Sequence, residues 1–322
     1  MSNCQAYEMV VSYAFLGVKN MTITPFDNSD YEVLLSDLIA DIYYSEISIS
    51  SRIVLLRKLT EIIARRFLNL GKNEKMELGD ITTANKNPNY KTTERLNAVD
   101  NILRKDFEAT IDYLRETGNK HSHTQNNIPA SLDDFLESER FIWDLFSFLF
   151  TQYFLKYNLS LTSDKNVLSM FSKLPPEIRF RTLQKILDIK GFDNVMLLDK
   201  YLLSLVKCRS WEAAYYWLIS NKDEITAMYY PTVEEIIDYN EDFSEDELPL
   251  KLKQFDNVFG LLSSKIRDPR VKSASGGKYI TFEDASEYYR AKELDIYLSN
   301  TDEQNEFKKL LYFCFIGRIA TQ

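Results

Sequence analysis

Residues that interrupt secondary structure are scarce in this chain. Nine glycines and eight prolines occur among 322 residues, whereas an average protein contains about 7 glycines per 100 residues. Folds built from many short strands need frequent turns, and turns draw on these two residues. The shortage argues against a turn-rich β fold, and the many Leu, Ile, Lys and Glu residues predict an all-α protein.

Cysteine and long apolar runs are also rare. The three cysteines, Cys4, Cys208 and Cys314, lie far apart, so the sequence predicts neither a disulfide framework nor a cysteine-based zinc site. The N-terminus lacks a basic segment followed by an apolar stretch, and the most apolar run, 141–150, contains Asp144 and is too short to cross a bilayer. We therefore expect a cytoplasmic protein that makes no contact with membranes.

Positive charge is in deficit. The chain carries 39 basic and 48 acidic residues, and its sequence pI is about 5.0. A protein that coats RNA or DNA usually displays a basic surface. The composition thus argues against a broad nucleic-acid-binding surface, but it leaves room for a small local site.

Histidine occurs only twice. His121 and His123 lie two residues apart, shortly after Arg115. Histidine is the side chain whose ordinary pKa lies closest to neutrality, so such a cluster is a candidate for proton transfer. The same stretch, with its Gly118-Asn119 pair, is also compatible with an ordinary solvated loop.

Apolar residues at three- and four-residue spacing predict four long helices in the first half of the chain. These helices cover about residues 30–43, 51–70, 93–117 and 132–157. Gly118 is expected to end the third helix in a left-handed conformation. Ser131, with Asp134 three residues later, predicts the start of the fourth. The polar, Asn-rich stretch 71–93 is expected to form a long loop, and such loops tend to be mobile or functional.

Helices joined in this way predict an up-down four-helix bundle. We assign residues 30–158 to the bundle, 1–29 to an N-terminal extension packed on it, and 159–322 to a second, multi-helical domain, because the composition changes near Asn158. Helices of the second domain are expected near residues 164–173, 176–190, 193–208, 211–229, 233–239, 282–299 and 302–319.

The second domain also contains two charged segments. Residues 234–247 carry eight acids and no base, whereas five bases surround the Ser- and Gly-rich segment 273–277. Three of these bases, Arg267, Arg270 and Lys272, are candidates for binding the phosphates of a substrate. Solvated loops without a ligand are the alternative.

A short motif at the end of the third predicted helix resembles that of the HEPN superfamily of four-helix-bundle domains. Many members carry an arginine, four to six further residues and a histidine, a spacing that Arg115 and His121 satisfy. One branch instead carries Leu-Arg-x-x-Gly-Asn-x-x-x-His, which residues 114–123 match with His123 as the histidine. Residues 57–61 also look like the Arg- and Glu-bearing second helix of the family. The resemblance covers roughly residues 30–158.

This resemblance implies an endoribonuclease that needs no metal ion or other cofactor and whose site is shared by two copies of the chain. Arg115 would hold a phosphate through its planar, permanently charged guanidinium. His121 and His123 would supply the base and the acid for attack by the 2′-hydroxyl. Asn119 would orient an imidazole or a phosphate oxygen, and Lys120 would add charge. The implied partners are RNA, a second copy of the chain, and a neutralising or trigger protein, because toxins and anti-phage defence proteins are common in the superfamily.

One residue departs from the family pattern. Many nuclease members place Asn, Asp or His directly after the arginine, whereas this chain has Glu116. The departure favours an alternative in which the bundle is a non-catalytic module that dimerises or binds a nucleotide or a partner. A metal site built from the two histidines with Asp112 or Glu116 is a further alternative.

Overall fold

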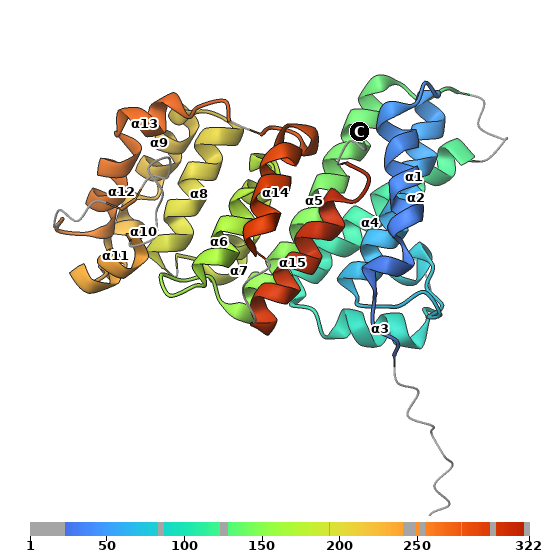
Figure 1. The fold of residues 1–322 in the computed structure, drawn as a ribbon, viewed down its shortest axis with the longest axis horizontal. Helices are drawn as coiled ribbons and strands as arrows, with labels where there is room; N and C mark the ends of the chain where they lie inside the picture. The colour runs from blue at the N-terminus through green and yellow to red at the C-terminus, as the bar shows by residue number, and fades with distance from the viewer. Residues whose placement is uncertain are drawn as a thin grey trace, which may run out of the picture.

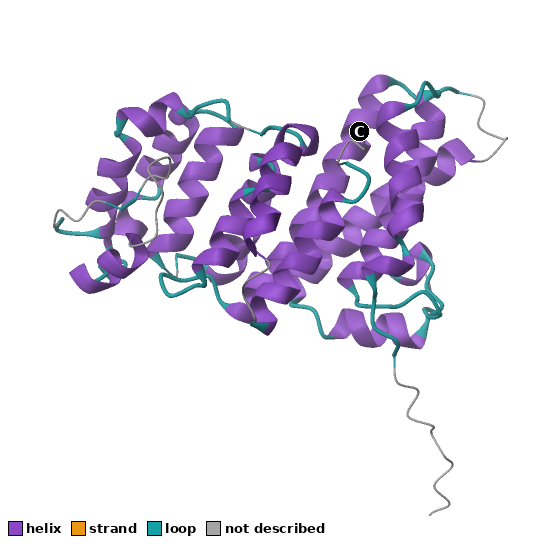
Figure 2. Cartoon of the chain, in the orientation of Figure 1, coloured by secondary structure: helices purple, strands orange, loops and turns teal. Residues whose placement is uncertain are grey.

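The computed structural model describes residues 23–82, 87–122, 128–192, 194–240, 249–250, 255–277, 279–296 and 301–318. Every regular element within these ranges is a helix, which confirms the all-α class (Figure 2). The helices form an elongated array, with residues 32–157 at one end and residues 195–273 at the other (Figure 1). Within the described ranges, no helix combines the length and the apolar character needed to cross a membrane.

The first helices of the array pack around one another. Their bounds are α1 Glu32–Ile39, α2 Ile49–Phe67, α3 Tyr90–Asn97, α4 Asn101–Ser122 and α5 Leu132–Tyr157, with a π-helical segment at Ala40–Tyr44 and 3-10 turns at Asn28–Asp30 and Leu78–Asp80. Helix α2 packs against both α4 and α5, and α4 also packs against α5. Where the three helices meet, the centre of the Phe107 ring from α4 lies 4.2 Å from the centre of the Phe67 ring in α2. It lies 5.7 Å from the centre of the Phe148 ring in α5. An aromatic cluster thus fixes the relative positions of these three helices.

Capping residues explain where two of these helices begin. The Ser131 hydroxyl accepts a hydrogen bond from the Asp134 amide, and the Asp134 carboxylate accepts one from the Ser131 amide at 2.8 Å. This capping box confirms the predicted start of α5. The third predicted helix is in fact two, because the carboxylate of Asp100 accepts from the amides of Ile102 and Leu103 and so begins α4 as a new helix after α3.

The predicted loop at 71–93 is anchored in its first part. The Arg65 guanidinium donates to the carbonyl oxygens of Gly71, Glu74 and Met76 at 3.3, 2.8 and 3.2 Å. The Glu74 carboxylate, 5% exposed, accepts from the Thr24 amide at 2.8 Å and pairs with the ammonium of Lys91. These contacts hold residues 71–76 against α2 and against the segment before α1.

The end of α2 also differs from the prediction. The helix ends at Phe67 rather than near residue 70, and Asn69 takes the left-handed conformation, with φ 51°. Gly71 follows, and a side chain does not fit there, since a Cβ would lie 2.7 Å from the carbonyl oxygen of Pro25. The residues before Ile23, including the apolar segment 9–16, lie outside the described ranges.

Further helices follow Asn158. They are α6 Lys165–Ser172, α7 Pro176–Lys190, α8 Val195–Cys208, α9 Trp211–Ser220, α10 Lys222–Thr226, α11 Val233–Asn240, α12 Val258–Ile266, α13 Pro269–Ser273, α14 Phe282–Ile296 and α15 Asp302–Phe315. Helix α7 covers the predicted range 176–190 and begins at Pro176, a residue that suits the first position of a helix. The helix predicted at 211–229 is interrupted at Asn221, and the sequence predicted no helix over α12 and α13, which are too short to display a clear period.

Helix α15 returns to the N-terminal helices, and Figure 1 shows it beside α5. The Tyr153 hydroxyl donates to the carbonyl oxygen of Glu303 at 3.1 Å, and Lys156 pairs with Glu306 at 2.6 Å. At the end of α15, Gly317 approaches α1 so closely that a Cβ would lie 2.8 Å from the Cα of Ser36. The two ends of the described chain therefore share one apolar core.

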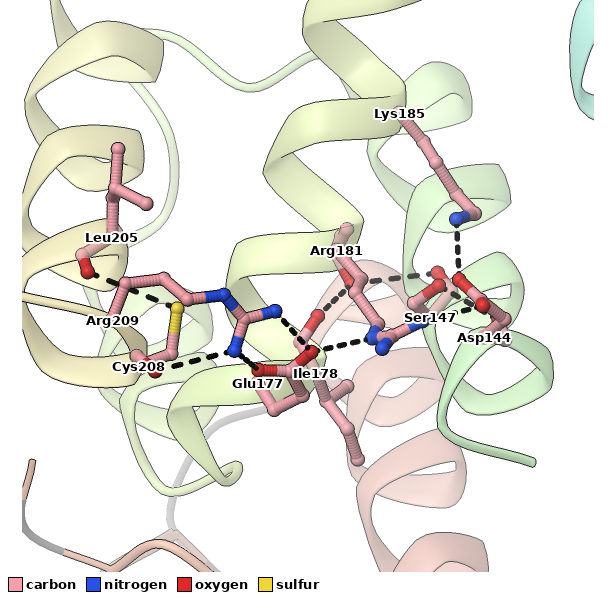
Figure 3. A network of polar contacts seen from close by, with 10 residues as sticks. Asp144, Ser147, Glu177, Ile178, Arg181, Lys185, Leu205, Cys208 and Arg209 are labelled. Atoms are coloured by element: carbon pink, nitrogen blue, oxygen red, sulfur yellow. Dashed lines mark hydrogen bonds and ion pairs between the residues drawn. The ribbon is translucent and has the colours of Figure 1, made fainter. Parts of the chain in front are cut away.

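A network of ion pairs joins α5, α7 and α8 (Figure 3). Asp144 of α5 accepts from Arg181 at 2.5 Å and from Lys185 at 2.8 Å, both on α7. Glu177 binds Arg181 at 2.8 Å and, through its other oxygen, Arg209 at 2.8 Å. Contacts therefore cross the boundary at residue 158, and the division into two domains at that point stays a prediction.

Candidate functional site

Helix α4 extends into the motif that contains the histidines. Helix α4 runs without interruption to Ser122, and Gly118 is a buried residue inside it. The prediction that Gly118 ends the helix in a left-handed conformation is therefore wrong. The apolar stripe Leu103, Phe107, Ile111, Leu114 includes Gly118 as its next member, because four residues make roughly one turn.

Gly118 is present because another helix lies against it. A Cβ at this position would lie 2.6 Å from both the Cβ and the Cδ of Arg57, and 2.9 Å from its Cγ. The aliphatic stem of Arg57, from α2, therefore crosses α4 at Gly118. The Arg57 Nε is buried and has no hydrogen-bond partner among the described residues. Arg57 itself lies half-buried between the two helices.

Arg115 lies on a partly open side of α4. Its side chain is 20% exposed, and its Nη2 donates to Asp112 at 2.8 Å and to Glu116 at 3.3 Å. Its Nε is buried and lacks a partner among the described residues. The guanidinium is therefore partly neutralised by two carboxylates on its own helix, and both are more exposed than Arg115 itself, at 41% and 67%.

His121 lies on a different side of the helix. At about 100° per residue, His121 is within roughly 20° of Leu114, which faces inward, and about 120° away from Arg115. The His121 side chain is half-buried, and its Nε2 is inaccessible and has no partner among the described residues. Asn119 lies on the same side as Arg115, one turn further along the helix.

The start of α5 lies within electrostatic reach of the end of α4. The pKa of the Asp134 carboxyl is lowered, first by hydrogen bonds from the backbone and the hydroxyl of Ser131, and to a smaller extent by the charges of Lys120 and His121. Lys120 itself is exposed. The positive end of the motif thus lies near the acidic first turn of the next helix.

One copy of the chain does not bring the motif's arginine and histidine together. Arg115 and His121 are separated by about 9 Å along the helix axis as well as by the rotation. His123, the other histidine of the motif, lies outside the described residues. Among the described residues, no group of three or more His, Cys, Asp or Glu side chains is arranged to hold a metal ion.

The described bases of the second half's basic segment do not form one positive patch. Lys265 is buried in an ion pair with Asp199 at 2.5 Å, and the Tyr239 hydroxyl donates to the same carboxylate at 3.1 Å. Arg270 pairs with Asp268, at 3.2 Å. The ammonium of Lys272 lies 4.9 Å from the centre of the Trp211 ring. Arg267 is exposed and forms no ion pair with a described residue. Helices α12 and α13, which carry or adjoin these bases, lie at the end of the array opposite α4 (Figure 1).

Two features of the site have a recognisable signal in the sequence. A glycine inside an apolar helical stripe signals close approach of another backbone or side chain, and that signal would have identified the crossing at Gly118. Asp112 stands three residues before Arg115, a spacing at which helical side chains meet. Arg57 could not have been placed from its own position, because its contact is with a residue distant in sequence.

Comparison of the chain with protein-family models, with curated proteins and with solved structures gave no match.

Proposed function

We propose that this chain is a metal-independent endoribonuclease of the toxin or anti-phage defence type, acting as a homodimer. The proposal takes α1, α2, α4 and α5 as a HEPN-like four-helix bundle and the motif of α4 as its active site. The remaining helices would recruit RNA or respond to a trigger or neutralising protein.

The observation that carries the proposal is the state of His121. An imidazole nitrogen that is buried and unpartnered has a cost, because buried polar groups normally form hydrogen bonds. In Arg57 and Arg115 the Nε atoms share this condition. Arginines elsewhere among the described residues, such as Arg66 and Arg179, also have an unpartnered Nε, so the imidazole nitrogen of His121 is the atom that distinguishes this motif.

The separation of Arg115 and His121 supports a site made of two copies. In one copy the two side chains leave α4 in directions about 120° apart. A second copy placed against the Arg115 side could bring its own histidine to the phosphate that Arg115 binds. Two exposed leucines near the start of α5, Leu132 and Leu136, at 58% and 45%, provide apolar surface close to this end.

The reaction would proceed by attack of the 2′-hydroxyl on the adjacent phosphate. One imidazole accepts the 2′-hydroxyl proton, and a second, protonated imidazole donates to the leaving 5′-oxygen. Arg115 stabilises the additional negative charge that forms on the phosphate oxygens. The products are a 2′,3′-cyclic phosphate and a 5′-hydroxyl, so no water molecule and no metal ion takes part in this step.

A second candidate function rests on the carboxylates beside Arg115. Asp112 and Glu116 already accept hydrogen bonds from the Arg115 guanidinium, and a phosphate would have to displace them. If they remain in place, the bundle is a non-catalytic dimerisation or binding module.

The test is cleavage of a mixed RNA substrate by the purified full chain in EDTA. Arg115→Ala and the double change His121→Ala/His123→Ala are each expected to reduce cleavage at least about a hundredfold. Arg104→Ala is the matched control, because Arg104 lies on the same helix and pairs with Glu108 at 2.6 Å. Glu116→Gln is expected to raise the rate severalfold, since it removes one competitor for Arg115.

The outcomes separate the two functions. Cleavage that persists in both motif variants, or that appears only with a divalent metal ion, contradicts the proposal. A wild-type chain that leaves RNA intact in EDTA at micromolar concentration, with Glu116→Gln equally inactive, supports the binding module.

A further inference from the structure

Arg179, in the first turn of α7, is buried without a partner for its charge. It is 8% exposed, and no described residue forms a hydrogen bond or an ion pair with its guanidinium. Arg318, which is also buried, differs in this respect, because its Cζ lies 4.1 Å from the centre of the Phe282 ring and its Nη1 lies 4.0 Å from a Glu283 oxygen. A charge is costly to remove from water unless an opposite charge or hydrogen bonds replace the water. The described part of the fold does not supply these for Arg179.

The groups that surround Arg179 do not carry a compensating charge. Among the described residues, those that act on its charge are the Cys208 thiol at the end of α8 and the Tyr288 hydroxyl of α14. Thiols and phenols are ordinarily neutral at pH 7, and burial raises the pKa of the Cys208 thiol to about 12. Burial lowers the pKa of Arg179 only to about 10, so the guanidinium keeps its positive charge at neutral pH.

The acid nearest to Arg179 in the sequence is directed elsewhere. Glu177 precedes it by two residues, so at about 100° per residue the two side chains leave α7 in directions about 160° apart. The Glu177 carboxylate pairs with Arg181 at 2.8 Å and with Arg209 at 2.8 Å (Figure 3). Glu177 therefore neutralises two other arginines and not Arg179.

One end of the Arg179 guanidinium remains open to a ligand. Its Nε is closed to solvent, whereas Nη1 and Nη2, which form no hydrogen bond with a described residue either, are not among the closed atoms. These two nitrogens form a planar fork that matches two oxygens of a phosphate or a carboxylate. An anion can therefore approach Arg179 end-on, through Nη1 and Nη2.

The Ser- and Gly-rich segment 273–277 packs at the same corner of the fold. Gly277 has a left-handed φ of 70°, and a Cβ there would lie 2.8 Å from the carbonyl oxygen of Lys207 and 3.5 Å from the Cγ of Pro176. Pro176 stands three residues before Arg179, so the two lie on the same side of α7. The segment that the sequence marked as a candidate for phosphate binding thus lies beside the first turn of α7, on the side of Arg179.

Hydroxyls and further positive charge favour phosphate over a carboxylate as the anion. The Ser275 hydroxyl accepts from the Trp211 amide at 3.2 Å, and the ammonium of the exposed Lys272 lies 4.9 Å from the centre of the Trp211 ring, so this part of the segment is fixed at the start of α9. Lys207 directly precedes Cys208 at the end of α8. A phosphate group carries up to two negative charges and accepts several hydrogen bonds, whereas a carboxylate carries one charge.

We propose that Arg179 anchors a binding site for a phosphate group, present either as the free ion or as a monoester. Nη1 and Nη2 donate to two phosphate oxygens, and the phosphate supplies the negative charge that the surroundings of Arg179 lack. No residue of the α4 motif takes part, so the outcome of a test at this site leaves the ribonuclease proposal unaffected.

The test is calorimetric titration of the full chain with inorganic phosphate, methyl phosphate and acetate. Inorganic phosphate or methyl phosphate is expected to bind saturably at one site per chain, at least about tenfold more tightly than acetate. Arg179→Met is expected to weaken this binding at least about tenfold, because it removes charged hydrogen bonds. Lys190→Gln is the matched control, since it removes a positive charge from the same helix roughly 16 Å further along the axis, and it should leave binding unchanged.

Melting temperatures of the same proteins separate a ligand site from a structural role. Methionine fills similar space without a charge, so in phosphate-free buffer Arg179→Met should be at least as stable as the wild type. Phosphate should raise the melting temperature of the wild type and of Lys190→Gln, because a ligand that binds the folded state stabilises it, but not that of Arg179→Met.

Each outcome of these experiments decides for or against the site. Tighter binding of methyl phosphate supports it with a monoester as the ligand, and tighter binding of inorganic phosphate supports it with the free ion. The proposal is overturned if neither binds saturably, if acetate binds as tightly as they do, or if Arg179→Met binds with wild-type affinity. An Arg179→Met protein much less stable than the wild type in phosphate-free buffer also overturns it, because Arg179 would then have its counter-charge within the fold.

Discussion

Gly118→Ala tests the crossing of α2 and α4 most directly, because two opposing effects of known size meet at this residue. Replacing glycine by alanine inside a helix normally stabilises it by about 0.8 to 1.0 kcal/mol. Here the new Cβ would lie 2.6 Å from the Cβ and Cδ of Arg57, whereas ordinary contacts between carbon atoms are about 3.5 to 4.0 Å. The two helices must therefore separate by roughly 1 Å at this point.

The cost of that separation decides whether Gly118→Ala stabilises or destabilises the protein. Forcing an extra methyl group into a packed interior typically costs about 1 to 3 kcal/mol. The Cβ of Arg57 is attached directly to the α2 backbone, so a change of rotamer cannot relieve all of the overlap. We expect a net loss of about 1 kcal/mol in the free energy of unfolding, despite the better helix propensity of alanine.

The assay is urea unfolding followed by circular dichroism, with the transition midpoint as the readout. Gly79→Ala is the matched control, because a Cβ at Gly79 would meet nothing within 4 Å; its midpoint should equal or exceed that of the wild type. A Gly118→Ala protein as stable as the wild type would refute the crossing. Combining it with Arg57→Ala should recover part of the loss, since that change removes Cγ and Cδ but keeps Cβ.

Two further predictions concern ion pairs. The pKa of Glu74 is lowered from its ordinary 4.5, first by the hydrogen bond from Lys91 and then by that from the Thr24 amide; the resulting stability is present above pH 4.5 and is lost as the pH falls through the lowered value. Thermal melts from pH 3 to pH 7 should therefore show a melting temperature that falls in acid, and Glu74→Gln should reduce this fall. Equal pH profiles for the two proteins would contradict this role. Asp144→Ala should lower the free energy of unfolding by about 1 to 3 kcal/mol, because it leaves the partly buried Arg181 and Lys185 without their common acid. Arg140→Ala is the control, since it breaks an exposed pair with Glu137 and should cost less than about 0.5 kcal/mol. Denaturant unfolding of the two variants measures the difference.

Local signals in the sequence predicted much of the fold. Ser131 with Asp134 marked the start of α5 and Pro176 that of α7, because a cap or a fixed φ acts within a few residues. The break between α3 and α4 was missed, although Asp100 has the side chain that begins such a helix. The error at Gly118 has the opposite origin. Gly118 was predicted to end a helix, whereas a glycine is required there because Arg57 of α2, which is distant in the sequence, packs against it.

The candidate site was predictable only as a set of residues in one stretch. Sequence spacing placed Arg115 and the histidines in a common motif, but a helix that continues to Ser122 sends Arg115 and His121 to different sides. The ion pairs that separate the bases of residues 265–272 could not be predicted either. Lys265 is buried because Asp199 lies opposite it in the fold, and nothing near Lys265 in the sequence indicates that partner.

The return of α15 to the first helices has a consequence for the order in which the fold can form. Helix α15 begins at Asp302, roughly 150 residues after α5 ends. A ribosome that adds about 5 to 20 residues per second needs on the order of 10 seconds for that stretch. During this interval the rings of Phe150 and Phe154 can contact Phe171 of α6, but they lack Phe307, whose ring centre finally lies 5.4 and 6.0 Å from theirs. The nascent chain therefore exposes part of this apolar surface until α15 emerges, and any activity that depends on a complete N-terminal core begins only after that.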